Sequence, residues 1–252
     1  MQARNSLCVA VIFAASTSAA VAAEIRVLTA GAYKPIVLAL APAFEQQTGH
    51  KLIVANDTAG ALERRIGQGE AFDVAVLPPA GIERLTKAGR LVTEAQAPLA
   101  RVAIGVAVKR GAPMPDIATV EALQKTLLAA RAVAYIDPAA GGSSGIYLSQ
   151  LFERWGLAGQ IKAKAVLVPG GLVAERVVNG EADLALHQIS EILAVPGAVL
   201  VGPIPREVQN YTVYVGALGS AAAAPDAARA LLAALGAASA REVLKEKGME
   251  AP

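Results

Sequence analysis

Residues 132–156 read AVAYIDPAAGGSSGIYLSQLFERWG, and this stretch decides the fold class. Its first five residues are apolar and include strand-forming types, so they predict a short buried strand. Its end carries Tyr147, Leu151 and Trp155 at a spacing of four, which is typical of one face of a helix that ends at Gly156. A loop of small residues lies between them. The order of strand, glycine-rich loop and helix is the building unit of an α/β protein.

The same order repeats along the chain and predicts two α/β units with parallel or mixed sheets flanked by helices. No internal repeat of 20–50 residues is found. Further strands are expected at 25–28, 51–55, 73–77, 101–109, 165–168, 182–186, 199–201 and 211–217, and further helices at 35–44, 62–66, 82–88, 118–131, before 180 and at 225–247.

Composition places the chain among globular proteins. It has 252 residues, of which 54% are hydrophobic and 17% charged, so it is too apolar for a disordered chain. The 23 basic and 21 acidic residues are interspersed and only 4% of residues are aromatic, so no nucleic-acid surface is expected. With one cysteine and two histidines, neither a disulfide nor a metal site is expected. No cofactor is predicted.

The first residues have the order of a secretory signal peptide. Arg4 supplies a positive end, 7–15 is apolar, and small residues follow up to Ala23. The alternative is a membrane anchor, but the apolar stretch is shorter than the roughly 20 residues that spanning a bilayer requires. We therefore expect residues 1–23 to be a cleaved signal peptide, no membrane span after its removal, and a periplasmic location.

Loops at the ends of the expected strands share one chemistry: they are rich in glycine and small residues and carry hydroxyl groups. In open α/β sheets, ligands bind beyond the carboxyl ends of strands, beside helix N-termini. Free N–H groups and the positive end of the helix dipole favour an anion there. The loops are 29–33, 56–60, 137–145, 168–171 and 187–190.

The loop 141–145 predicts anion binding most strongly. Its glycines let backbone N–H groups approach a ligand, and the alternative is that Ser143 or Ser144 only caps the following helix. No lysine follows the glycines as in a P-loop, and the glycine spacing does not fit a dinucleotide site. The loop also matches the letters Gly-x-Ser-x-Gly, but a nucleophilic serine must follow a strand directly, and here 137–142 intervenes.

The roles of two aromatic side chains, those of His187 and Tyr33, are each open to two interpretations. His187 ends an expected strand beside Gln188 and is either a structural imidazole or a site residue. Tyr33 lies at the mouth of the first loop and is either a pocket wall or ordinary packing.

Motifs spread over 24–248 have the pattern of a known family. They are VLTAGA at 27–32, LERRI at 62–66, DV at 73–74, DP at 137–138 with GIY at 145–147, and GEAD at 180–183. With these motifs the chain resembles the periplasmic molybdate-binding family, a two-lobed class of type 2 solute-binding proteins that serve ABC importers.

The resemblance implies two lobes joined by two crossing strands, near 101–109 and 211–217, with the ligand in a cleft that closes by a hinge. The first lobe would comprise 24–100 and 212–252, and the second 101–211. The implied function is capture of a small anion by a monomer that delivers it to an ABC permease.

The family's ligand contacts fall on altered residues in this chain. Ala32 stands where the family has a serine, Asp57 and Thr58 replace part of a serine run, and Gln188 replaces a tyrosine. The anion is therefore left open as a molybdate-like oxyanion or a di- or tricarboxylate. The expected ligand-binding residues are Ala32, Tyr33, Asp57, Thr58, Ser143, Ser144, Gly145, Gly170, His187 and Gln188.

The segments 144–149, 190–197, 201–205 and 209–212 resemble a subgroup of this family that contains a periplasmic aconitate isomerase. The alternative function is therefore interconversion of trans- and cis-aconitate by proton transfer, which needs a base near its working pH and an anion-binding shell. In this alternative His187 is the base, and Ser143, Ser144 and Thr58 hold carboxylates.

Overall fold

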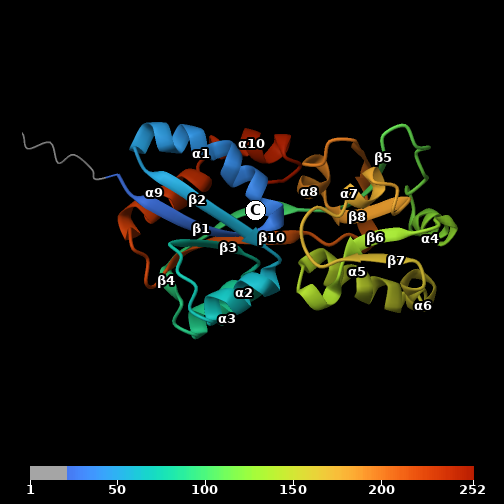
Figure 1. Cartoon of the computed structure of the whole chain (residues 1–252), viewed down its shortest axis with the longest axis horizontal. Helices are drawn as coiled ribbons and strands as arrows, with labels where there is room; N and C mark the ends of the chain where they lie inside the picture. Colours follow the sequence, from blue (N-terminus) through green and yellow to red (C-terminus); the bar gives the residue numbers. More distant parts are fainter. Residues whose placement is uncertain (1–21) are drawn as a thin grey trace, which may run out of the picture.

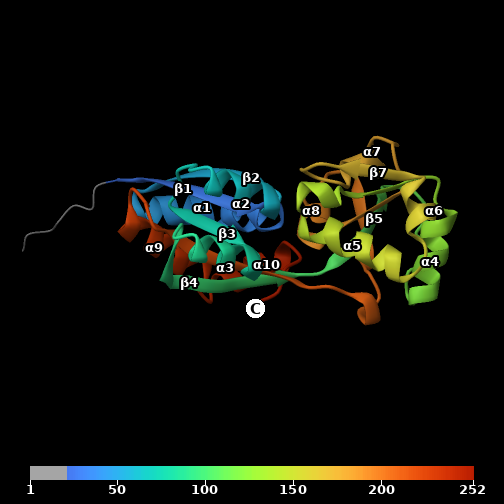
Figure 2. The same ribbon diagram turned by 90° about the horizontal axis from the view of Figure 1, so that it is seen from below.

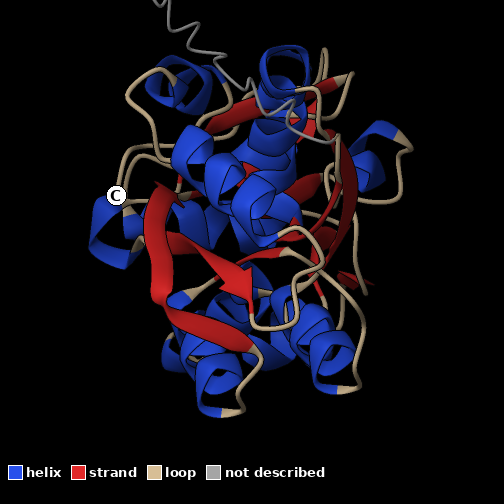
Figure 3. Ribbon diagram, turned by 90° about the vertical axis from the view of Figure 1, so that its left-hand side faces the viewer, coloured by secondary structure: helices blue, strands red, loops and turns tan. Residues whose placement is uncertain are grey.

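The computed structural model describes residues 22–252, which form two five-stranded mixed sheets side by side along the long axis of the molecule (Figure 1). Seen along that axis, helices lie on both sides of the strands (Figure 3). The predicted α/β fold class with two flanked sheets is confirmed. The predicted signal peptide, 1–23, lies outside the described residues except for its last two. Among residues 22–252, no helix is long and apolar enough to cross a membrane.

The first sheet combines N-terminal strands with one strand from the last quarter of the chain. In spatial order its strands are β2 (Lys51–Asp57), β1 (Glu24–Ala30), β3 (Val74–Leu77), β10 (Thr212–Gly219) and β4 (Leu91–Val102). β1 is parallel to β2 and β3, whereas β10 is antiparallel to β3 and β4.

The second sheet repeats this arrangement. Its strands in spatial order are β7 (Ala165–Val168), β6 (Val133–Ile136), β8 (Leu184–Gln188), β5 (Ile104–Lys109) and β9 (Ala198–Pro203). β6 is parallel to β7 and β8, whereas β5 is antiparallel to β8 and β9. In both sheets the parallel strands therefore end at one edge, where ligands bind in α/β proteins.

Helices cover both faces of each sheet, which explains the continuous apolar runs in the sequence. Every residue of β3 and of β6 is buried, as expected for strands covered on both faces. The first sheet packs against α1 (Lys34–Thr48), α9 (Pro225–Leu235) and α10 (Ala240–Glu246) on one face, and α2 (Ala59–Gly67) and α3 (Pro79–Lys87) on the other. The second sheet packs on one face against α4 (Val120–Ala129), α5 (Ser143–Arg154) and α6 (Ala158–Lys162). On its other face it packs against α7 (Glu175–Val178) and α8 (Ile189–Leu193).

We call each sheet with its helices a lobe, and two connections join the lobes (Figure 2). β4 pairs with β10 as far as Val102 in the first lobe, and β5 begins at Ile104 in the second, so the chain changes sheet at Ala103. The chain returns to the first lobe after the short helix η3 (Arg206–Val208), where it enters β10. The expected single strand 101–109 is therefore wrong. Both halves are strand-like, and no turn residue marks the change of sheet.

Two other expectations were wrong. Most of β4 was not predicted, because Pro98 and several polar residues weaken the strand pattern. The expected helix 225–247 is two helices, since α9 ends at Leu235 with Gly236 as its C-cap and α10 begins at Ala240. Alanine-rich sequence hid this break, because alanine favours a helix throughout.

The buried side chain of Asp73 links the first sheet to the start of α9 by hydrogen bonds. Its carboxylate accepts hydrogen bonds from the amides of Arg26 (2.8 Å), Ala223 (2.7 Å) and Ala224 (3.3 Å). We predict that Asp73→Ala lowers the free energy of unfolding by about 2–4 kcal/mol, measured by urea denaturation, because these amides lose a charged acceptor.

Asp183, which precedes β8 as Asp73 precedes β3, is the matched control. Its carboxylate also accepts from a backbone amide, that of Arg131 (2.7 Å), but its side chain is 42% exposed. Water can replace this contact, so Asp183→Ala should cost about 1 kcal/mol or less. Equal losses for the two variants would contradict this account of Asp73.

Candidate functional site

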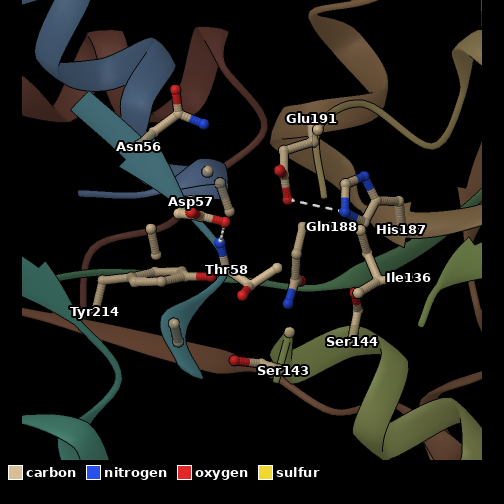
Figure 4. Close-up of a pocket in the computed structure, with 16 residues that line it drawn as sticks. Asn56, Asp57, Thr58, Ile136, Ser143, Ser144, His187, Gln188, Glu191 and Tyr214 are labelled. Carbon is tan, nitrogen blue, oxygen red and sulfur yellow. Dashed lines mark hydrogen bonds and ion pairs between the residues drawn. The ribbon is translucent and has the colours of Figure 1, made fainter. Parts of the chain in front are cut away.

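A cavity of about 40 Å³ lies between the two lobes, at the carboxyl ends of the parallel strands (Figure 4). The last residues of β1 and β2 line it from the first lobe, and those of β6 and β8 from the second. Since one water needs about 10–15 Å³ by this measure, the cavity has room for a few waters or one small ion as the lobes stand.

The structure brings most of the predicted ligand-binding residues to this cavity, although they come from four loops far apart in the sequence. Those that line it are Ala32, Asp57, Thr58, Ser143, Ser144, His187 and Gln188.

Tyr33, Gly145 and Gly170 do not line the cavity. Tyr33 is fully buried in the first lobe and packs against Tyr214, with ring centroids 6.2 Å apart. A Cβ on Gly145 would collide with the carbonyl oxygen of Ile136, so this glycine lets α5 approach β6. Gly171 lines the cavity in place of Gly170.

Residues at three helix N-termini line the cavity, although in α2 the amides of Gly60 and Ala61 already donate to Gly141 and to Thr58 Oγ1. The short helix η1 (Gly31–Tyr33) leads into α1, α2 starts after Thr58, and α5 starts after Gly142. The first N–H groups of a helix have no partner within it, and the helix dipole places positive potential there. These ends come from both lobes, so an anion in the cavity would be held from two sides.

The hydroxyl groups differ in what they can offer a ligand. The N-cap of α5 is Gly142 with no side-chain cap, so the alternative that Ser143 or Ser144 only caps the helix is wrong. Thr58 Oγ1, by contrast, donates to the carbonyl oxygen of Ala140 (2.5 Å) and accepts from the amide of Ala61 (3.2 Å). Its proton is therefore already committed within the protein.

His187 and Glu191 form a buried pair on one wall of the cavity. His187 Nε2 lies 3.2 Å from Glu191 Oε2, and their side chains are only 2% and 10% exposed. Burial lowers the pKa of His187 and raises the pKa of Glu191, because neither charge is solvated there. At neutral pH the histidine is therefore neutral, and the carboxyl group is largely protonated.

The other carboxyl group at the cavity, Asp57, lies in a different environment. Its Oδ1 accepts from the amide of Thr58 (2.8 Å), and its Oδ2 lies 3.5 Å from Arg65. The side chain is 36% exposed. None of the described residues that line the cavity is a lysine or an arginine, so an anion there would have to be held by backbone amides and polar side chains. Residues 22–252 also contain no cluster of metal-binding side chains.

Sequence reasoning missed Asn56, Glu191 and Tyr214 as lining residues. Glu191 follows His187 by four residues, and this spacing was the available signal. Tyr214 lies within β10, and only the pairing of that strand brings it to the cavity. Burial raises its pKa, and the nearby Glu191 raises it further.

The lobes touch each other around the cavity. The amide of Gly60 donates to the carbonyl oxygen of Gly141 (3.0 Å), and Ser190 Oγ donates to the carbonyl oxygen of Ala32 (2.8 Å). A Cβ built on Gly60 would lie 2.9 Å from the Cα of Gly141, closer than real contacts allow. The closed arrangement therefore requires glycine at this point.

Comparison with known proteins decides the family. The family model described as bacterial extracellular solute-binding protein matches residues 25–250. The chain belongs to this family of extracellular solute-binding proteins. The resemblance found in the sequence is thereby confirmed.

This solute-binding protein has relatives with different named functions. It is 37% identical over 232 residues to an aconitate isomerase from a Pseudomonas species, covering 90% of this chain and 87% of that one. The periplasmic molybdate-binding protein of Azotobacter vinelandii has the same fold, with a TM-score of 0.77, 20% identity, and coverage of 90% and 99% of the two chains. The sulfate-binding protein SubI of Mycobacterium tuberculosis follows with a TM-score of 0.72, 16% identity, and coverage of 91% and 87%.

The Gly60–Gly141 contact gives a test of lobe closure. Gly60→Ala should weaken binding of an anion probe, trans-aconitate or molybdate, by about 10- to 100-fold in calorimetry, because the added methyl group holds the lobes apart. The variant should still fold, since alanine suits the interior of α2 better than glycine.

Gly67→Ala is the matched control for this prediction. Gly67 ends the same helix, and a Cβ there would meet nothing within 4 Å. It should bind the probe like the parent protein. If Gly60→Ala also binds normally, closure through this contact is not needed for binding.

Proposed function

We propose that this protein captures a small anion between its two lobes in the periplasm. The observation that carries the proposal is the convergence of the N-termini of η1–α1, α2 and α5 on a cavity whose described lining has no lysine or arginine. Backbone amides at helix ends can hold a desolvated anion without a full opposite charge. The residues proposed to contact it are Ala32, Asp57, Ser143, Ser144, His187 and Gln188.

A di- or tricarboxylate fits the lining better than a compact dianion. A compact dianion would place its whole charge close to Asp57, whereas a longer molecule can put one carboxylate at each helix end and an apolar carbon near Asp57. Protonated Glu191 can donate a hydrogen bond to such a ligand. The 37% identical relative is named for an aconitate-converting activity, which supports the same ligand class.

Besides Glu191, Gln188 can also donate a hydrogen bond to the ligand. Its Nε2 donates to Thr212 Oγ1 (2.8 Å), and its buried Oε1 has no partner among the described residues. Turning this amide over would let the threonine hydroxyl donate to Oε1 and would free Nε2 for a ligand oxygen.

The location and partner belong to the same proposal. Members of this family are described as extracellular, and the N-terminal pattern supports export by a cleaved signal peptide over 1–23. We propose that the mature protein is a monomer that passes its ligand to an ABC permease.

A thermal-shift screen tests anion capture. A di- or tricarboxylate at 100 times its dissociation constant should add about 2.7 kcal/mol of stability, which raises Tm by about 5–10 °C for a chain of this size. The panel should hold trans-aconitate, citrate, molybdate, tungstate and sulfate, with sodium chloride at equal ionic strength as the control. A shift with molybdate alone would contradict the polycarboxylate assignment, and no shift with any anion would contradict anion capture.

A second candidate function is isomerisation of aconitate. The buried His187–Glu191 pair favours it, because a carboxyl group with a raised pKa beside a neutral imidazole suits proton transfer near neutral pH. The relative named aconitate isomerase, which matches 90% of this chain, favours it too.

Incubation with trans-aconitate tests this second candidate. We predict that the parent protein forms cis-aconitate at about one turnover per second or faster, as is usual for an enzyme, followed by proton NMR. If trans-aconitate binds but no cis isomer forms over many hours, the protein is a binding protein and not an isomerase.

A further inference from the structure

We propose that Glu191 is the catalytic acid–base residue that exchanges a proton with the bound ligand, and that His187 is the positioning residue that holds it. This inference rests on the isomerase candidate above. It revises the assignment of His187 as the base.

The position of the Glu191 carboxyl group supports this role. Its Oε2 faces His187, and its Oε1 would lie 2.5 Å from a Cβ placed on Gly31. The carboxyl group therefore extends from α8 of the second lobe to the bare backbone of the first lobe, at the helix end where an anion would bind. In Figure 4 it points into the space between Asp57 and His187.

The imidazole of His187 is less able to reach a ligand. Its Nε2 is engaged by Glu191, and its Nδ1 is buried without a hydrogen-bond partner among the described residues. Since burial lowers the pKa of His187, the ring stays neutral. A neutral imidazole can accept a hydrogen bond from the carboxylic acid at Nε2 or, as the other tautomer, donate a hydrogen bond to the carboxylate. His187 can thus hold Glu191 in both of its protonation states.

The surroundings of the Glu191 carboxyl group bring its pKa close to neutral pH. It is faced by His187 from β8, by Tyr214 from β10 and, across the cavity, by Asp57 from β2. No lysine or arginine lies among these groups to stabilise its charge, and burial raises its pKa to about 8. Both forms are therefore accessible near neutral pH, which general acid–base catalysis requires.

The chemical step can be written without any further reactant. Ionised Glu191 removes a proton from the methylene group of an unsaturated tricarboxylate, so a C–H bond breaks and an O–H bond forms. The electron pair spreads over the allylic carbons and the adjacent carboxylate, whose charge the helix N-termini stabilise. Glu191 then returns the proton to the other allylic carbon, and the double bond moves by one position.

Glu191→Gln is the direct test, because glutamine keeps the shape of the side chain but cannot take up the proton. With trans-aconitate in D₂O, the parent protein should form cis-aconitate and exchange the ligand's methylene protons for deuterium, both followed by proton NMR. In the variant both rates should fall by about 10²- to 10⁴-fold. Its affinity, measured by calorimetry, should change by less than about tenfold, which also shows that it folds. Glu153→Gln, on the exposed side of α5, is the matched control and should behave like the parent.

A pH profile separates positioning from a merely structural role for His187. In the parent protein kcat/KM should rise with pH through a midpoint near 8, because the base form of Glu191 appears there. In His187→Leu the ionised carboxylate loses the hydrogen bond that the imidazole donates, which raises the pKa of Glu191, so the midpoint should move to higher pH. A lower rate with an unmoved midpoint would contradict the positioning role.

The outcomes distinguish failure of this inference from failure of the proposed function. If the parent isomerises and Glu191→Gln does so at a similar rate, the assignment of Glu191 is wrong while the isomerase function stands. If the parent binds trans-aconitate but neither isomerises nor exchanges it, both the isomerase candidate and this inference are overturned, and anion capture stands. If no anion binds, the proposed function itself fails.

Discussion

A buried site with no lysine or arginine in its described lining can hold an anion only through oriented dipoles and hydrogen bonds, and this constraint shapes the whole arrangement. A single helix end supplies a partial charge, so several must meet at one point. The N-termini of α1, α2 and α5 belong to different lobes. They surround one cavity only when the lobes touch, which explains why Gly60 and Gly141 meet without side chains between them.

Much of the fold was predictable because covered sheets leave a plain signal in the sequence. The runs 74–77 and 132–136 are apolar throughout, since helices shield both faces of β3 and β6. Glycine and hydroxyl residues in the segments between strands and helices indicated the loops that now line the cavity, including Ser143 and Ser144. Local sequence could do this because strand, loop and helix start are neighbours along the chain.

Features that depend on distant contacts were not predictable. Tyr214 reaches the cavity through the antiparallel pairing of β10, and Glu191 owes its raised pKa to burial between the lobes. Tyr33 is the last residue of the first loop, yet its ring packs into the core of the first lobe. No turn residue in the sequence around Ala103 indicates that the chain changes sheet there. In each case the deciding partner is far away in the sequence, so periodicity and turn residues carry no information about it.

A crystal structure of the protein with bound trans-aconitate tests the central claim most directly. The account predicts carboxylate oxygens about 3 Å from first-turn amides of α5 in one lobe and of η1 or α2 in the other, with the ligand's methylene carbon facing Glu191. A ligand held by surface lysines or arginines, or touching one lobe only, would contradict it.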